Sequence, residues 1–109
     1  MATQKSPKQG DIWWVNLDST MGKEISKKRP CLIVSPDDMN EHLATVLAAP
    51  ITSTLRHWPT RVTITLARKK SSVALDQIRA LDTARLVKKM TSIDAEPALA
   101  VLREMFEKN

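Results

Sequence analysis

The chain has 109 residues and a formal net charge of +5, and 42% of its residues are hydrophobic. This length fits one domain, and the apolar content is that of a folding chain rather than a disordered one. No run approaches the roughly 18 apolar residues that a membrane span needs, and the polar start MATQKSPKQ lacks the apolar stretch of a signal peptide. Cys31 is the single cysteine, which excludes an intrachain disulfide and favours a reducing, cytoplasmic setting.

Positive charge is concentrated in residues 23–29, 56–70 and 79–89, whereas acidic residues fall mostly in residues 37–41 and near the C-terminus. Such asymmetry favours attraction to a polyanion, with RNA and DNA as the leading candidates. A basic surface that is merely solvated is the alternative. Charge therefore points to nucleic acid without identifying a site.

The first third of the chain predicts two strands separated by a long loop. We expect residues 1–9 to form a flexible tail and residues 10–109 to form a single domain. DIWWVNL at 11–17 combines aromatic and β-branched residues and predicts a strand. Residues 18–28 carry turn formers and charges and predict a loop, and the apolar run PCLIVS at 30–35 predicts a buried strand.

The middle of the chain predicts two further strands. PDDMNEH at 36–42 is a polar connection with room for one helical turn. Residues 44–51 fit a helix or a strand by composition, and we favour a strand because the run is bounded by Pro50 and a threonine. TRVTITLA at 60–67 alternates apolar residues with threonines, which predicts a strand with one wet face, and RKKSS at 68–72 predicts the turn after it.

The last third predicts short strands at 73–75, 78–81 and 86–93. A helix follows, capped by Asp94 and with Pro97 tolerated in its first turn. Its apolar stripe comprises Leu99, Leu102, Met105 and Phe106. The predicted fold class is mainly β with a C-terminal helix, a small antiparallel barrel that this helix closes. Because the chain has only two glycines, prolines, serines and lysines must make the corners.

The sequence predicts no metal site. His42 and His57 lie far apart without ligand-spaced partners, and the lone cysteine lies in a predicted strand. We interpret the acidic residues 37–41 as a solvated turn, with a hard-cation site as the alternative. At most one of Trp13 and Trp14 is free to stack on a base, because neighbouring residues of a strand point to opposite faces.

The basic loop GKEISKKRP at 22–30 is the strongest candidate for a functional site. Gly22 permits a tight turn or a close approach to a ligand, and Pro30 holds Arg29 in extended geometry at the start of a strand. A guanidinium fixed there is suited to grip a phosphate through two parallel hydrogen bonds. Glu24, a carboxylate within this cationic loop, does not suit a plain anion-binding patch but does suit catalysis on an anion.

Five segments, in order and spacing, closely resemble the MazF/PemK family of ribosome-independent, mRNA-cleaving toxins: GDIWWVNLD, G-K-E-x-x-x-x-R-P, LIVSP, API-T-S and VALDQIRALD. The resemblance runs from Gly10 to about the C-terminal helix. It implies an SH3-like antiparallel barrel of the MazF/PemK/CcdB toxin type, acting as a homodimer. Such a toxin cleaves single-stranded mRNA at a short sequence, without a metal or other cofactor. The resemblance also implies a cognate antitoxin, MazE-like or PemI-like, and a bacterial cytoplasm.

In the reaction that the resemblance implies, a ribose 2′-OH attacks the adjacent phosphorus, leaving a 2′,3′-cyclic phosphate and a 5′-OH end. Matched position by position, Arg29 would stabilise the five-coordinate phosphorane, and Thr52 would hydrogen-bond a phosphate oxygen. Arg29 has also been cast in the family as an acid or base, but a guanidinium with a pKa above about 12 is a poor proton donor near neutrality. We therefore favour its electrostatic role.

Glu24 and Asp76 are the two remaining catalytic candidates that the resemblance implies. A carboxylate among cations stays ionised, so Glu24 can accept a proton, orient Arg29 or bind a base edge. Asp76 is either a general base or a structural hydrogen-bond acceptor at a bend. For Thr52 the non-catalytic interpretation is a strand-end threonine that caps a turn.

The resemblance also implies an RNA-binding set: Gly22, Lys23, Lys27, Lys28, Ser53, Arg56, His57, Trp58 and Gln77. Within this set an arginine and an indole, Arg56 and Trp58, are suited to clamp and stack a splayed base. A mobile loop with its tryptophan tucked into a dimer interface is the alternative interpretation.

The chain departs from the family in places that bear on mechanism. The PemK-like branch has histidine where Lys23 stands and arginine where Ala74 stands. These departures weaken a mechanism centred on Asp76 and favour one based on Arg29 and Thr52. Two other functions stay open: a non-cleaving barrel toxin of the gyrase-poisoning type, and a catalytically inactive relative that only binds RNA or an antitoxin.

Overall fold

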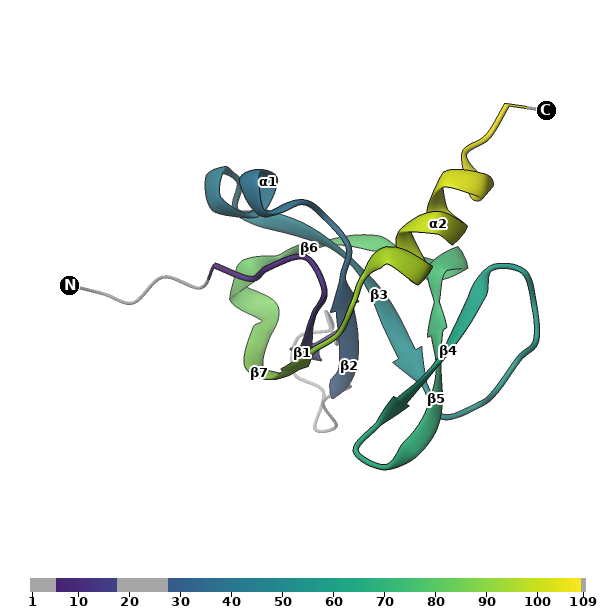
Figure 1. Ribbon diagram of the computed structural model, residues 1–109. Coiled ribbons are helices and arrows are strands. Elements are labelled where there is room, and N and C mark those ends of the chain that lie inside the picture. Colours follow the sequence, from purple (N-terminus) through teal and green to yellow (C-terminus); the bar gives the residue numbers. More distant parts are fainter. Residues whose placement is uncertain (1–5, 18–27, 109) are drawn as a thin grey trace.

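The computed structural model describes residues 6–17 and 28–108 (Figure 1). These residues form β1 (Asp11–Asn16), β2 (Lys28–Ile33), α1 (Asp37–His42), β3 (Thr45–Thr52), β4 (Arg61–Leu66), β5 (Lys69–Ala74), η1 (Leu75–Gln77), β6 (Arg79–Asp82), η2 (Thr83–Arg85), β7 (Leu86–Ser92) and α2 (Glu96–Met105). The elements η1 and η2 are single turns of 3₁₀ helix. Most of the predicted loop, residues 18–27, lies outside the described residues.

The strands form one antiparallel sheet in the order β4-β5-β3-β2-β1-β7, and β6 also pairs with β3. The sheet curls into a half-barrel, and α2 crosses one end of it (Figure 1). This architecture confirms the predicted fold class of a mainly β chain with a C-terminal helix. Within the part of the chain that the structure describes, no helix is long and apolar enough to cross a membrane.

The core has two parts because β2 is buried on both faces. Leu32 packs into a cluster beneath α2, whereas its neighbours Cys31 and Ile33 pack into a second cluster on the other face. Successive residues of a strand point to opposite sides, so an apolar run without alternation is what a doubly covered strand requires. This explains why PCLIVS reads as a continuous hydrophobic segment.

Helix α2 packs largely as predicted, but its N-cap is Ala95, one residue after the predicted Asp94. The Asp94 carboxylate accepts a hydrogen bond from the Glu96 N–H at 3.0 Å, and Pro97 lies in the first turn. Leu99, Leu102 and Met105 pack against the core cluster beneath the helix. Including Phe106 in this stripe was wrong: the helix ends at Met105, and Phe106 is 73% exposed.

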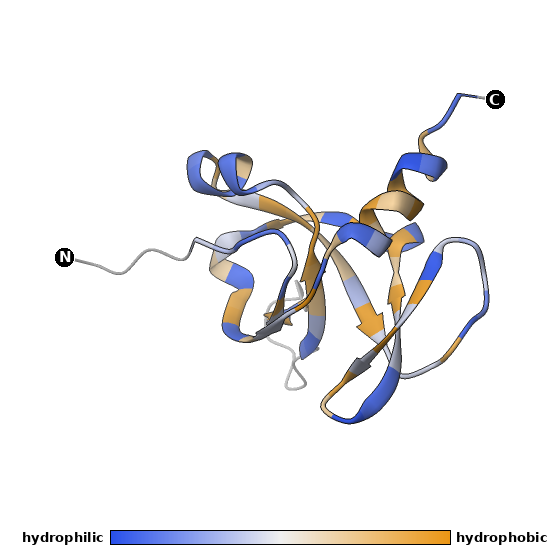
Figure 2. Ribbon diagram, viewed as in Figure 1, coloured by the Kyte–Doolittle hydropathy of each residue, from blue (hydrophilic) through white to orange (hydrophobic). Residues whose placement is uncertain are grey.

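One strand prediction was wrong. RKKSS was expected to be a turn, but β5 begins at Lys69, and the turn is the residue pair Ala67 and Arg68. The start of β5 is hydrophilic (Figure 2), so it lacks the alternation that identifies a strand from sequence. Pairing with β4 from Leu66↔Lys69 to Arg61↔Ala74 keeps these polar residues extended.

The chain just before β1 is held by the polar connection that follows β2. Pro7 is fully buried, and its carbonyl accepts a hydrogen bond from Asn40 Nδ2 at 2.9 Å. Gly10 then adopts φ +97°, where an added Cβ would lie 2.5 Å from the carbonyl oxygen of Ile93. Only glycine fits this close approach between the start of β1 and the residue that follows β7.

The β4–β5 turn offers a test of the fold. Ala67 and Arg68 have φ values of +52° and +68°, so both residues of this two-residue hairpin are left-handed, and such turns favour Asn-Gly. We expect the double variant Ala67→Asn/Arg68→Gly to be more stable by about 1–2 kcal/mol, because the left-handed strain is relieved. Urea denaturation measures this as a higher midpoint with an unchanged slope.

Lys69→Gly serves as the control, because glycine in the adjoining strand should lower stability by roughly 0.5–1 kcal/mol. A double variant no more stable than the parent chain would contradict this account of the turn.

Candidate active site

A cavity of about 690 Å³ lies where β2 begins, β3 ends and η1 follows β5. Its lining comprises Leu17, Arg29, Pro50, Thr52, Thr54, Arg56, Trp58, Arg61, Ala74, Asp76, Gln77 and Arg79. Three of the four predicted catalytic residues, Arg29, Thr52 and Asp76, therefore share one cavity. The fourth, Glu24, lies outside the described residues.

The β2–β3 register brings Arg29 and Thr52 to the same end of the sheet. Cys31 pairs with Pro50. Arg29 precedes Cys31 by two residues and Thr52 follows Pro50 by two, so in antiparallel strands both lie at this end, where both line the cavity. The side chain of Arg29 is exposed. Among residues 6–17 and 28–108, no hydrogen bond or ion pair engages its guanidinium, so its donors are available to a ligand.

Thr52 has the turn-capping role that its sequence position suggested, and it also lines the cavity. Its Oγ1 accepts a hydrogen bond from the backbone N–H of Thr54 at 3.1 Å, so it does stabilise the turn after β3. A hydroxyl that accepts in this way still has its own proton to donate. Thr52 therefore presents an oriented O–H donor at the wall of the cavity that also holds Arg29.

Asp76 is held by two neighbours on β4 and just before it. Arg61 Nε donates to Asp76 Oδ1 at 2.7 Å and Arg61 Nη2 to Oδ2 at 3.3 Å, while Thr60 Oγ1 donates to Oδ1 at 3.0 Å. The hydrogen bonds from Arg61 are the largest cause that lowers the pKa of Asp76 below its ordinary value. Asp76 is therefore an ionised acceptor, and each of its two oxygens accepts at least one hydrogen bond.

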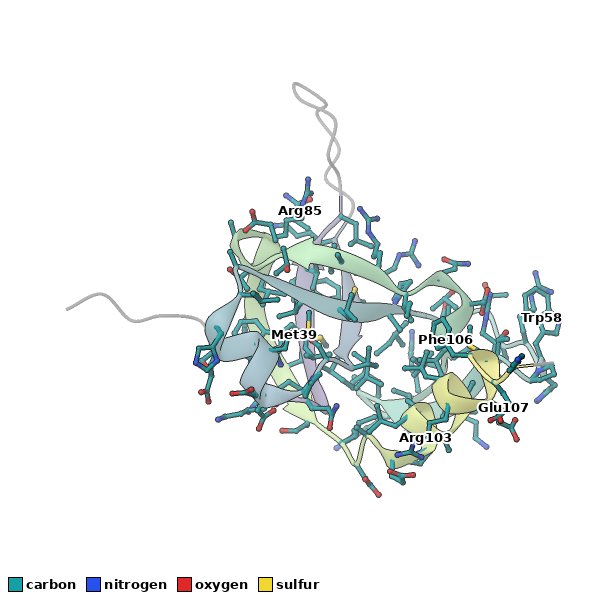
Figure 3. The ribbon with its side chains drawn as sticks, turned by 90° about the horizontal axis from the view of Figure 1, so that it is seen from above. Met39, Trp58, Arg85, Arg103, Phe106 and Glu107 are labelled. Carbon is teal, nitrogen blue, oxygen red and sulfur yellow. The ribbon has the colours of Figure 1, made fainter. Side chains whose placement is uncertain are left out.

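Trp58 forms the outer wall of the cavity. The Arg61 guanidinium carbon lies 4.6 Å from the indole centroid, and that of Arg56 lies 5.4 Å away, both within cation–π range. The indole is nonetheless 49% exposed and sits at the margin of the molecule (Figure 3). Trp58 thus lies against two arginines, Arg56 and Arg61.

Arg61 and Arg79 line the cavity, but the sequence did not suggest them. The signal for Arg61 was present, since the alternation of β4 places it on the same face as Thr63 and Thr65. For Arg79 the only signal was its position after Gln77 in the VALDQIRALD segment. With these two, four arginines and one carboxylate line the cavity, which makes it a site for anions.

A second cavity, of about 440 Å³, adjoins the first at Arg29, which lines both. Its lining comprises Trp14, Lys28, Arg29, Pro30, Ile51, Ser53, Leu66, Ala67, Lys69, Ser71 and Met90. Two residues of the predicted RNA-binding set, Lys28 and Ser53, are in this cavity, whereas Arg56, Trp58 and Gln77 are in the first. The two cavities together form a basic surface on either side of Arg29.

The remaining predicted RNA-binding residues are not brought into these cavities. His57 is exposed but lines neither of them, while Gly22, Lys23 and Lys27 lie outside the described residues. Trp13 packs against the second core cluster, so of the two neighbouring tryptophans only Trp14 reaches a cavity. No group of three or more His, Cys, Asp or Glu residues within the described ranges is arranged to hold a metal ion.

Comparison with known proteins identifies the family. Residues 8–106 match the family described as PemK-like, MazF-like toxin of type II toxin–antitoxin system. Endoribonuclease EndoA of Bacillus subtilis (strain 168) is 34% identical over 95 residues, which cover 82% of each chain. Endoribonuclease MazF of Staphylococcus epidermidis is 32% identical over 100 residues, which cover 86% of this chain and 83% of that protein.

Solved structures agree. A MazE–MazF structure from Deinococcus radiodurans superposes with a TM-score of 0.77 at 25% identity, covering 94% of each chain. The Mycobacterium tuberculosis toxin MazF-mt6 superposes with a TM-score of 0.74 at 29% identity, covering 91% of this chain and 98% of that one. The chain therefore belongs to the PemK-like, MazF-like toxins of type II toxin–antitoxin systems.

Proposed function

We propose that this chain is a sequence-specific endoribonuclease toxin that cleaves single-stranded mRNA in a bacterial cytoplasm and is inhibited by a cognate antitoxin. The observation that carries this proposal is the meeting of Arg29 and Thr52 in one arginine-lined cavity. The relatives EndoA and MazF, which are 34% and 32% identical, are named as endoribonucleases. Site geometry and family therefore point to the same chemistry.

In the proposed reaction the 2′-oxygen of one ribose forms a bond to the adjacent phosphorus, and the bond from phosphorus to the 5′-oxygen of the next nucleotide breaks. The products are a 2′,3′-cyclic phosphate and a 5′-OH. Negative charge grows on the two non-bridging oxygens in the transition state, where preorganised donors lower the barrier. Arg29 supplies a doubly donating guanidinium, and the Thr52 hydroxyl supplies a further donor.

A proton must leave the 2′-OH, and another must reach the departing 5′-oxygen. Asp76 is a poor base for the first transfer because its hydrogen bonds, above all those from Arg61, stabilise the carboxylate and lower its pKa. We assign this proton transfer to another group, with Glu24 of the basic loop as the candidate that the sequence offers.

We further propose that the toxin works as a homodimer and that an acidic antitoxin segment occupies the basic surface in place of RNA. A MazF relative from Deinococcus radiodurans is known in a structure with MazE. The described cavities carry Arg56, Arg79, Lys28 and Lys69 in addition to Arg29, and these cations suit an acidic chain as well as a phosphate backbone. Competition between two polyanions for one surface would thus provide inhibition.

A barrel toxin that poisons gyrase without cutting RNA is the second candidate. It would need neither a phosphate-directed arginine nor an adjacent hydroxyl donor, so the cavity favours cleavage. A topoisomerase assay run beside an RNA cleavage assay separates the two functions, and gyrase inhibition without RNA products would replace our proposal.

The first prediction concerns the catalytic arginine. Arg29→Ala should lower the rate of RNA cleavage by about 100-fold or more, because the transition state loses its main charge-stabilising donor. Arg29→Lys should recover only part of the rate, since an ammonium cannot form two parallel hydrogen bonds to a phosphate. Mapping the 5′ ends of fragments from one long RNA measures the rate, the end chemistry and the cleavage sequence together.

Arg103→Gln is the matched control for Arg29→Ala, because it removes the same charge from α2, outside both cavities. It should cleave like the parent chain. Normal cleavage by a folded Arg29→Ala variant would remove Arg29 from the catalytic site.

The second prediction concerns metal ions. Because we assign stabilisation of the phosphorane to Arg29 and Thr52, cleavage should proceed at the same rate in excess EDTA. The measurement is a time course of fragment formation with EDTA, compared with one in added Mg²⁺. Loss of cleavage on chelation, followed by recovery when Mg²⁺ is restored, would refute metal-independent cleavage.

A further inference from the structure

The Asp76–Arg61 pair has the geometry of a support rather than of a reacting group. The Arg61 side chain is only 6% exposed, so both its charge and its position depend on the carboxylate that it meets. The edge of the guanidinium donates two hydrogen bonds to Asp76, through Nε and Nη2. Two such hydrogen bonds are the contact of a bidentate arginine–carboxylate pair, which restricts the relative orientation of the two groups.

The Arg61 guanidinium also lies against Trp58, with its central carbon 4.6 Å from the ring centroid. A planar guanidinium that holds a carboxylate at its edge still has its faces free to stack on an aromatic ring. Arg61 therefore connects Asp76 in η1 to the indole of Trp58 in the loop between β3 and β4.

The backbone near Trp58 is fastened to the same cluster. The Trp58 carbonyl accepts a hydrogen bond from the Arg61 N–H at 3.1 Å, and Thr60 of the intervening turn donates to Asp76. These contacts fix the backbone at Trp58 and hold Arg61 against its ring. Arg56 also lies over the ring, 5.4 Å from the centroid, and 49% of Trp58 remains exposed at the cavity wall. An exposed ring whose position is fixed has the properties of a stacking platform, because every nucleobase offers a flat face.

We propose that Trp58 is the platform on which an unpaired RNA base stacks beside the phosphate bound at Arg29, and that Asp76 positions this platform through Arg61. In this arrangement Asp76 is a positioning residue, and it acts on binding of the substrate rather than on proton transfer. The inference rests on the proposed function for the identity of the ligand as RNA. It adds to that function a support built from Asp76, Arg61 and Thr60.

The binding test uses a short random-sequence RNA pool in which every ribose is 2′-O-methylated, so that no 2′-OH is available and cleavage cannot occur. Trp58→Leu should weaken binding of this pool about ten-fold or more, the usual effect of losing one stacked base. Trp58→Phe keeps an aromatic face and should bind within about three-fold of the parent chain. The part of the tryptophan fluorescence that RNA quenches should be smaller in Trp58→Phe, with Trp14 of the second cavity as the source of any quenching that remains.

Asp76→Asn tests the positioning step. It should weaken binding about as much as Trp58→Leu, and the double variant should bind no more weakly than either single variant, because both changes remove one platform. In cleavage assays KM should rise about ten-fold, while kcat should fall by less than about three-fold and keep its pH profile. A general base would behave differently, with kcat lowered by about 100-fold or more at unchanged binding.

Glu96→Gln is the matched control for Asp76→Asn. Glu96 forms the same kind of two-point pair with Arg103, at 2.8 and 3.2 Å, but on α2 and outside both cavities. This variant should change neither binding nor cleavage. Asp76→Glu should recover part of the RNA binding that Asp76→Asn loses. Thermal unfolding of both variants shows whether a loss of binding reflects a lost platform or a misfolded chain.

Three outcomes would overturn the inference: Trp58→Leu binding the pool like the parent chain, additive losses in the double variant, or a collapse of kcat in Asp76→Asn without a loss of binding. These outcomes can be told apart from failure of the proposed function. If the chain binds the RNA pool and the fluorescence of Trp58 is quenched, but no RNA is cleaved, the nuclease function is contradicted and the stacking platform is supported. If the chain cleaves RNA equally well with and without Trp58, the nuclease function is supported and the stacking platform is contradicted.

Discussion

The site depends on one topological constraint, the change of partner along β3. Its first half, Thr45 to Ala48, pairs with β6, whereas its last two residues pair with β5. Pro50 lies between these two sections and lacks a backbone N–H, so a break in the hydrogen-bond ladder is tolerated there. The chain that leads from β5 to β6 must cross this break, and it does so as η1, anchored by the fully buried Leu75. The cavity is thus built where the sheet divides.

The strands that the sequence predicted correctly are those whose burial leaves a pattern. β2 is buried on both faces and has an apolar run, whereas β4 is partly buried on one face and has an alternating sequence. The start of β5 has neither pattern, because Lys69 and Lys70 are exposed and are held extended only by pairing with β4. Phe106 shows the opposite failure, since its spacing fits the stripe of α2 but the helix ends one residue earlier. Both errors arise where tertiary pairing or helix termination decides the structure and local composition does not.

The functional site, like the fold, has residues that the sequence predicted and contacts that only the folded structure reveals. Resemblance to a known family supplied Arg29, Thr52 and Asp76, and the fold brings all three to one cavity. The partner of Asp76 could not be read from spacing, because Arg61 lies 15 residues earlier and meets the carboxylate only through the β4–β5 register. The alternation of β4 placed Arg61 on the face that is expected to contact solvent. In the structure, however, the Arg61 side chain is nearly buried.

That register also answers the concern raised by Ala74. An alanine there was expected to weaken a mechanism centred on Asp76, and Arg61, directly across the strand pair from Ala74, brings a guanidinium to the carboxylate from β4. The small side chain of Ala74 lines the cavity and leaves room for this approach. Once paired, Arg61 contributes little net charge, so attraction of phosphate falls to the other three arginines of the cavity, Arg29, Arg56 and Arg79. Asp76, the one described carboxylate of the cavity, thus fixes the shape of the cavity. The excess positive charge of the cavity comes from the arginines that no acid neutralises within the described residues.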